Sequence, residues 1–388
     1  MAPSKRLLSL DILRGITIAG MLLVNNPGSW DHLYEPLDHA EWIGLTPTDL
    51  VFPFFMFCMG VAMYFSLRKF NFRPSGQVLA KIARRALILF FIGWAVQWFG
   101  HALRGFYKPD CTAWDQWTLN GLQDVRILGV FQRLALVYLF GALCIIFVKH
   151  KLIPWLIGFI LVAYALILGL GNGYEFSLQN IIASIDNSLF GEGHLYHESV
   201  DGVKLAFDPE GLLSTLPGIA HVLIGFMAGK LVVTHHDNME RIGLLSVFGF
   251  SMLLGGWLLS YGIPCGKKMW SSTFVLITCG LASCTLSLLT YIIDMKGRKK
   301  WCSFFHAFGT NPLALYLIGT VLAIAFGAVQ FGHDLDDTPI TLHSLIYGGY
   351  CSLLGVGKLA SCLYALTFIF INWIFGYLLH KKNIIIEI

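Results

Sequence analysis

Long apolar segments alternate with short polar segments along almost the whole chain. Ten of the apolar segments are about 20 residues long, the length that a helix needs to cross the hydrocarbon core of a bilayer. Their approximate limits are 7–26, 48–67, 83–101, 127–148, 152–171, 212–233, 241–262, 271–293, 304–329 and 358–379. This pattern predicts an all-α polytopic membrane protein with about ten transmembrane helices.

Two further segments depart from this pattern. Residues 342–357 form a shorter apolar run with glycine interruptions, which we interpret as a short interfacial helix rather than a span. Residues 172–211 are polar and contain seven acidic residues, so they predict one sizeable external loop. No repeat or low-complexity stretch divides the rest, and we therefore expect a single membrane domain over residues 1–388.

The composition agrees with this pattern. Of the 388 residues, 56% are hydrophobic and only 13% are charged, whereas soluble domains are about 25% charged. These values exclude a disordered chain, a nucleic-acid-binding domain and most soluble enzymes. They make the lipid bilayer the expected surroundings of the chain.

Lys and Arg are distributed unevenly between the polar segments. With a cytoplasmic N-terminus, 18 of them fall in predicted cytoplasmic segments, 7 fall on the opposite side, and Arg14 and Arg133 fall within spans. Cytoplasmic loops carry the excess of basic residues, so we expect both termini in the cytoplasm. The densest cluster suits anionic lipid or a phosphorylated cofactor and comprises Arg68, Lys69, Arg73, Lys81, Arg84 and Arg85.

Seven of the nine cysteines lie in apolar runs, where a thiol behaves as a small apolar group. No cysteine pair has the spacing of a zinc site, and we expect no metal. Cys111 and Cys265 fall in predicted external loops. In an oxidising compartment such as a periplasm they are candidate partners for a disulfide.

Ionisable residues inside apolar spans cost about 2.5–3.5 kcal/mol on insertion scales and mark candidate functional sites. Asp11 and Arg14 are three residues apart, which favours a local ion pair. Gln132 and Arg133 are adjacent within a predicted span and suit an anionic or amide-rich ligand. Pairing of Arg133 with Asp11 or Asp294 is the structural alternative.

The segment between the first two spans, residues 25–49, contains no Lys or Arg. It contains two histidines, His32 and His39, and the acids Asp31, Glu35, Asp38 and Glu41. Such a loop attracts a cationic substrate such as an amine. Asp49 opens the next helix, where it can cap the helix or hold a histidine ring in one tautomer; capping alone is the simpler interpretation.

Other motifs, present or missing, limit the functions that the sequence supports. Asp208 and Glu210 precede the span at 212–233, where acids are ordinary capping residues. The sequence has no P-loop, no glycine motif for dinucleotides, and no HExxH or GxSxG motif. ATP-driven transport and soluble-type hydrolase chemistry therefore have no support.

Six blocks, in order along nearly the whole chain, resemble the transmembrane acyltransferases related to heparan-alpha-glucosaminide N-acetyltransferase. They are SLDILRG at 9–15, VNN at 24–26, HAEWIGLT at 39–46 with DLVFP at 49–53, GVFQR at 129–133, DPEG at 208–211 and GTNP at 309–312. Ile43 stands where we expect Asn or another polar residue. The chain looks like a short bacterial relative of this family.

The resemblance implies transfer of an acetyl group from cytoplasmic acetyl-CoA to the amine of an amino sugar on the periplasmic side of a bacterial inner membrane. It implies His39 as the catalytic histidine and Asn25 as its polar partner. Together with Asp49 these form the predicted catalytic group. The predicted cofactor-binding residues are Gln132, Arg133, Arg14, Arg84 and Arg85, and the predicted substrate-binding residues are Trp42, Glu41, Asp208, Glu210 and Asn311.

The residue chemistry agrees with this role. Histidine titrates near neutral pH, so His39 can take the proton of an attacking amine or carry the acetyl group as an acetyl-imidazole; both variants are open. Asn25 can donate a hydrogen bond to the thioester oxygen, and Asp49 can orient the His39 ring.

Two other functions fit the same pattern. An amino-sugar permease also has many spans and intramembrane charges, although no inverted repeat is evident. O-acetylation of a cell-envelope glycan would use the same histidine with a hydroxyl acceptor. The acidic loop and the resemblance favour an amine acceptor. Glycines near the last two spans permit close helix packing, so a homodimer is an open expectation.

Overall fold

The computed structural model describes residues 7–107, 125–235, 237–334 and 337–386, and these are mostly helical. The helices are α1 (Leu8–Val24), α2 (Val51–Arg68), α3 (Gly76–Gly105), α5 (Val130–Phe147), α6 (Ile153–Leu170), α7 (Ile181–Phe190), α8 (Thr215–Thr234), α9 (Asn238–Leu259), α10 (Ser272–Leu289), α11 (Cys302–Thr310), α12 (Pro312–Ala328), α13 (Leu342–Leu354) and α14 (Lys358–Lys381). Two antiparallel hairpins complete the fold: β1 (His197–Val200) with β2 (Val203–Ala206), and β3 (Gln330–His333) with β4 (Pro339–Thr341).

The prediction of an all-α membrane protein is confirmed at the level of fold class. Within the described residues, eight helices are long and apolar enough to cross a membrane, and a bent pair makes a ninth candidate. The first predicted span is α1, whose 17 residues rise about 25 Å. A helix of that length is slightly short of a 30 Å hydrocarbon core.

The span predicted at 304–329 is not one straight helix. It consists of α11 and α12, whose axes differ by 88°. The chain turns at Asn311, which lies outside the helical region (φ −131°, ψ 55°). The physical reason is Pro312, whose ring disfavours a helical conformation in the residue before it and which then starts the new helix at its first position.

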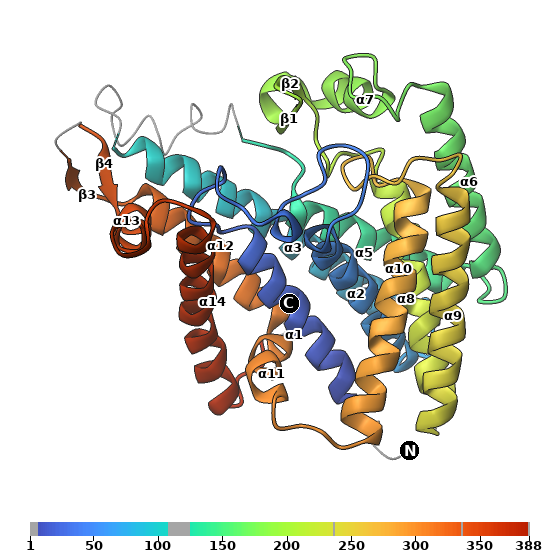
Figure 1. Ribbon diagram of the computed structural model, residues 1–388. Coiled ribbons are helices and arrows are strands. Elements are labelled where there is room, and N and C mark those ends of the chain that lie inside the picture. The colour runs from blue at the N-terminus through green and yellow to red at the C-terminus, as the bar shows by residue number, and fades with distance from the viewer. Residues whose placement is uncertain (1–6, 108–124, 236, 335–336, 387–388) are drawn as a thin grey trace.

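Helices from both halves of the sequence pack against each other. In Figure 1, α6, α8, α9 and α10 stand side by side, α12, α13 and α14 lie on the opposite flank, and α1 and α2 lie between them. The most extensive pairings are α9 with α10, α2 with α8, α1 with α11 and α3 with α5. The predicted short helix near 342–357 is α13, which packs along α14.

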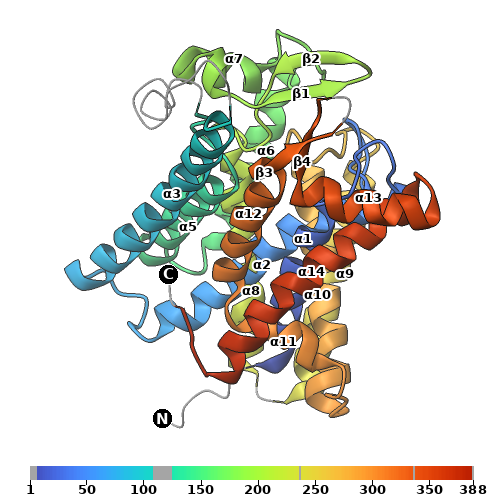
Figure 2. The same ribbon diagram turned by 90° about the vertical axis from the view of Figure 1, so that its left-hand side faces the viewer.

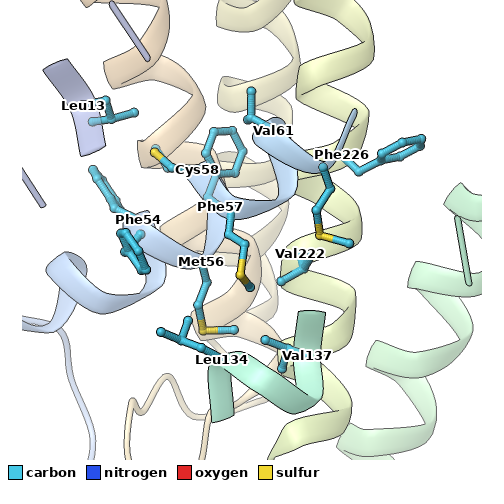
Figure 3. Close-up of a cluster of buried hydrophobic side chains, with 14 of the residues drawn as sticks. Leu13, Phe54, Met56, Phe57, Cys58, Val61, Leu134, Val137, Val222 and Phe226 are labelled. Carbon is cyan, nitrogen blue, oxygen red and sulfur yellow. The ribbon is translucent and has the colours of Figure 1, made fainter. Parts of the chain in front are cut away.

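Close contact between α2 and α8 forms the centre of the core (Figure 3). Gly60 and Gly225 allow this approach. A Cβ atom at Gly60 would lie 2.1 Å from the Val222 carbonyl oxygen, and one at Gly225 would lie 2.3 Å from the Phe57 carbonyl oxygen. Small residues at such a contact bring two membrane helices within van der Waals range along their backbones.

Three long connections meet at one end of the helices. Figures 1 and 2 show α7 and the β1–β2 hairpin at the end opposite the N-terminus. Trp42, from the 25–49 segment, donates through Nε1 to the Tyr174 carbonyl oxygen at 2.7 Å and packs against Phe207. The Gly44 amide donates to the Cys265 carbonyl oxygen at 2.8 Å. The 25–49, 172–211 and 260–271 segments therefore form one cap over the helix ends.

Candidate active site

His39 and Asp49 form a contact pair in this cap. His39 Nδ1 lies 2.6 Å from Asp49 Oδ1. An ionised carboxylate only accepts hydrogen bonds, so this geometry assigns the proton to Nδ1 and leaves a lone pair on Nε2. The Asp49 side chain is 1% exposed and that of His39 is 31% exposed. A buried acid thus holds a ring that remains accessible.

Asp49 is fixed by its position at the start of α2. It is the third residue of the short 3₁₀ turn Pro47–Leu50, where it forms a capping box with Thr46. Asp49 Oδ2 accepts from the amide nitrogens of Thr46 at 3.0 Å and Ala40 at 3.2 Å. The sequence left two alternative roles for Asp49, capping the helix or orienting the histidine ring. In the structure Oδ2 makes the capping contact and Oδ1 contacts His39.

Lys267, which the sequence did not single out, is the third member of this group. Its Nζ lies 3.1 Å from His39 Nδ1, 3.3 Å from His39 Nε2 and 3.7 Å from Asp49 Oδ1. Burial lowers the pKa of the Lys267 ammonium, whereas Asp49 and Glu210 oppose that shift. We call His39, Asp49 and Lys267 the outer triad.

The outer triad borders a cavity of about 190 Å³, here called the catalytic cavity. Helices α1, α2, α5 and α12 and the outer loops contribute to its walls. The polar side chains that line it are Asn25, His39, Asp49, Arg126, Tyr196, Glu198, Glu210, Lys267, Lys268 and Tyr316.

A second cavity of about 360 Å³, the adjacent cavity, shares Met21, Asn25 and Tyr316 with the first. Its other polar and aromatic lining residues are Asn26, Trp30, Arg104, Thr320, His343 and Tyr364. No acidic side chain among the described residues lines it. Arg104 therefore gives this cavity a positive charge that the lining residues do not offset.

Asn25 lies where the two cavities meet. It is the C-terminal cap of α1, and its backbone amide donates to the Met21 carbonyl oxygen at 3.1 Å. Its side chain is exposed and, within the described residues, has no hydrogen-bond partner. By contrast, the neighbouring Asn26 donates to the Leu22 carbonyl oxygen at 2.8 Å. The Asn25 amide is thus available to a ligand.

Asp208 and Glu210, both predicted to bind substrate, are held by Arg126. Its guanidinium contacts both oxygens of Asp208, at 2.7 and 2.5 Å, and Glu210 Oε2 at 2.5 Å. Burial alone would raise the pKa of Glu210, but the nearby guanidinium groups of Arg126 and Arg133 hold it below its ordinary value. Glu210 lines the catalytic cavity, whereas Asp208 does not.

Gln132 and Arg133 line neither cavity. Arg133 is fully buried and donates to the carbonyl oxygens of Pro209 at 2.9 Å and Ser214 at 3.0 Å, as well as to the Ser214 hydroxyl. It is not paired with Asp11 or Asp294. Gln132 is buried against Gly93 of α3, and its amide has no partner within the described residues.

The other predicted binding residues also lie away from the two cavities. Arg14 pairs with Asp11, as the spacing predicted, and Arg85 lies 4.6 Å from the Tyr138 ring centre. Arg84 is exposed on α3. Asn311 holds the backbone of residues 384 and 386 at the α11–α12 bend.

Two predicted residues belong to the cap itself. Glu41 is exposed, and Trp42 is buried in the cap. Neither lines a cavity. Cys111 lies outside the described residues, but Cys265 is a free cysteine in the structure, so the predicted disulfide between them is not formed there.

Three residues of the catalytic cavity that were not predicted shared one feature of the sequence that could have identified them. Arg126, Lys267 and Lys268 are basic residues on the side where the distribution of charge predicts few of them. Lys268 pairs with Glu198 at 3.1 Å, so it also links the β1–β2 hairpin to the cap. Tyr196 and Tyr316 carried no signal that distinguishes them from other tyrosines in apolar surroundings.

The arrangement supplies the parts of a proton-transfer site. A histidine with a free ring nitrogen faces a cavity, a buried carboxylate orients it, and a free amide donor lines the same cavity. Within the described residues, no group of three His, Cys, Asp or Glu side chains is arranged to hold a metal ion.

Comparison with known proteins gives two matches of similar extent. The human protein named heparan-alpha-glucosaminide N-acetyltransferase is 29% identical over 371 residues, which cover 80% of this chain and 52% of the human protein. The mouse protein of the same name is 28% identical over 376 residues, covering 82% and 54%. The chain thus spans about half the length of these relatives. No family model matches the sequence. The similarity along four-fifths of the chain nevertheless relates this protein to the heparan-alpha-glucosaminide N-acetyltransferases.

Proposed function

We propose that this protein is a membrane acetyltransferase that moves an acetyl group from acetyl-CoA to the amine of an amino sugar of the glucosamine type. The observation that carries the proposal is the His39–Asp49 pair at the wall of a cavity of about 190 Å³. The relatives' names refer to acetyl transfer onto a glucosaminide nitrogen, which supports the same chemistry here.

In the proposed reaction, the amine of the acceptor enters the catalytic cavity beside His39. His39 Nε2 takes a proton from the nitrogen as it bonds to the thioester carbon. The free amide of Asn25 donates a hydrogen bond to the carbonyl oxygen, where negative charge develops. The carbon–sulfur bond then breaks, and the proton on His39 passes to the departing thiolate. Asp49 stabilises the imidazolium formed in between.

The two cavities suggest how both substrates meet. The acceptor occupies the catalytic cavity, where the carboxylates of Asp49, Glu198 and Glu210 are balanced by three basic side chains. The acetyl thioester reaches Asn25 from the adjacent cavity, which Asn25 also lines. Asn25 belongs to both cavities, so the proposed reacting carbon lies at their junction. This assignment does not require Gln132 or Arg133 to touch the donor.

We further propose a multi-pass protein of a bacterial inner membrane, with both termini cytoplasmic and the outer triad on the periplasmic side. The uneven distribution of Lys and Arg supports this orientation. Labelling of single cysteines from outside intact cells tests it. A cysteine in place of exposed Glu41 should react with an impermeant maleimide, and one in place of exposed Lys296 should not.

The direct test is transfer of labelled acetyl from acetyl-CoA to glucosamine by purified protein in detergent. His39→Ala should abolish transfer while binding of CoA is retained. His32→Ala is the matched control, because His32 lies in the same segment but lines neither cavity. It should keep most of the parent's activity.

Other outcomes separate the alternatives. Transfer that persists in His39→Ala would remove His39 as the catalyst and keep the enzyme class. Transfer to glycan hydroxyls but to no amine would indicate an O-acetyltransferase. Absence of both CoA binding and transfer, with uptake of amino sugars into vesicles, would indicate a permease.

A further inference from the structure

Among the described residues, Lys267 is the cation closest to the His39–Asp49 pair, although Lys267 and His39 are 228 residues apart in the sequence. It belongs to the segment between α9 and α10, and its side chain is 18% exposed. Lys268, the next residue, is paired with Glu198. The cap thus directs two neighbouring lysines to different partners.

The position of Lys267 relative to the ring is informative. Its Nζ is nearly equidistant from Nδ1 and Nε2, at 3.1 and 3.3 Å. A donor placed along the lone pair of Nε2 would lie much farther from Nδ1, on the other side of the ring. Lys267 is therefore beside the imidazole and does not occupy the Nε2 lone pair that the proposed reaction needs.

The charges around His39 act in opposite directions. The Asp49 carboxylate, 2.6 Å from the ring, favours the imidazolium form. A base held permanently as a cation cannot accept another proton. The Lys267 ammonium, at a similar distance, disfavours the second positive charge. Asp38 accepts a hydrogen bond from the His39 backbone amide, and the pKa of Lys267 is itself raised by Glu210 and lowered by Lys268.

We propose that Lys267 is a positioning residue of the acyl transfer, whose ammonium group offsets Asp49 and keeps His39 neutral and ready to accept the proton of the amine. This inference rests on the proposed function, because it assigns a purpose to the protonation state of His39. It goes beyond that proposal by naming a residue without which the base works only at higher pH.

The experiment compares pH–rate profiles of acetyl transfer for the parent, Lys267→Met, Lys267→Arg and Lys268→Met. In Lys267→Met, the pH of half-maximal activity on the acid side should rise by about 1–3 units, the size of a shift caused by one nearby charge. Lys267→Arg keeps the charge and should keep the parent's acid limb. Lys268→Met should also keep it, whatever its effect on KM.

A second measurement does not depend on transfer. Diethyl pyrocarbonate modifies neutral imidazole, so mass spectrometry of His39 at several pH values reports its protonation directly. The midpoint should rise in Lys267→Met and not in Lys267→Arg. An unchanged midpoint in folded Lys267→Met, or a uniform loss of activity with an unmoved acid limb, would overturn the inference. Absence of transfer in the parent would instead overturn the proposed function, and the modification midpoint would still be measurable.

Discussion

The outer triad and the Arg133 cluster are two groups of buried charge in the same protein, and they are satisfied in different ways. One oxygen of Asp49 accepts from backbone amides, and the other contacts His39 beside a cavity. Arg133 donates to the backbone and hydroxyl of the segment before α8 and faces no cavity. Asp49 and Arg133 both stood out in the sequence, but only the outer triad keeps a group, the Nε2 atom of His39, free for a ligand.

This difference shows what distinguishes a site from a structural contact inside a membrane protein. A polar or ionisable side chain inside the membrane costs free energy unless it has hydrogen-bonding partners, and those partners belong either to a ligand or to the rest of the chain. Arg133 closes the turn that leads into α8, so its charge serves the fold. Substitutions at the cavities should therefore reduce activity with little loss of stability, and substitutions in the buried cluster should do the reverse.

The largest effect on activity is expected from Asp49→Asn. The substitution replaces a carboxylate with a neutral amide, so the negative charge that stabilises the His39 imidazolium is lost. Only one oxygen then remains to accept both from His39 and from the backbone amides, and kcat should fall about 10²–10⁴-fold. Loss of the capping contact should cost only about 1 kcal/mol of stability. A thermal melt beside the assay separates the two. Activity within tenfold of the parent would contradict the role of Asp49.

Asn25→Ala should follow, with a decrease in kcat of about 10²–10³-fold, the usual cost of losing one donor to a developing oxyanion. The melting temperature should be unchanged, because the Asn25 side chain has no partner among the described residues. Asn372→Ala in α14 is the control. Its amide donates to the Phe368 carbonyl oxygen at 2.9 Å and it lines neither cavity, so the change should lower stability and keep kcat. Equal kinetic effects of the two changes would refute the assignment.

Arg133→Met should destabilise the protein, because it leaves buried carbonyl oxygens without donors, at a cost of about 1–3 kcal/mol for each. Activity per folded molecule should fall less than tenfold. Detergent-solubilised protein can be tested by thermal melting and by the acetyl-transfer assay at low temperature. A stable variant that has lost CoA binding would make Arg133 a ligand of the donor.

The smallest effect is expected at Asp186 of α7, and it depends on pH. One oxygen accepts from the Leu212 amide at 2.9 Å, and the other has no partner among the described residues. Burial raises the pKa of Asp186 from 3.8 to about 6. A raised pKa in the folded state means that stability is lost as pH rises from about 4 to 6, by up to about 3 kcal/mol.

Asp186→Asn should therefore raise the melting temperature at pH 7.5 and lose most of that advantage at pH 4.5. Acetyl transfer should be unaffected, since Asp186 lines neither cavity. Equal melting temperatures of variant and parent at both pH values would show that the carboxylate is compensated in the folded protein.

Particular elements show how far prediction from the sequence reached. The local pairing of Asp11 with Arg14 followed from helical spacing, and the helix at α13 followed from its short apolar run. The bend between α11 and α12 had a local signal in Pro312, but the apolar run across it was long enough to suggest one span. Trp42 was predicted at the substrate, yet its ring fills the cap, because large aromatic surfaces are buried wherever packing permits.

The sequence by itself determined which segments are apolar enough to be helices in a bilayer, because the match between helix length and hydrocarbon thickness is a property of each segment alone. The resemblance of its motifs to a known family also identified His39 and Asn25 as candidates, and Asp49 stood out at the start of a span. Only the tertiary structure decided that Lys267 joins His39, that Arg133 does not, and that Asn25 belongs to two cavities. These contacts join segments distant in the sequence, and they depend on how helices pack rather than on any local pattern of residues.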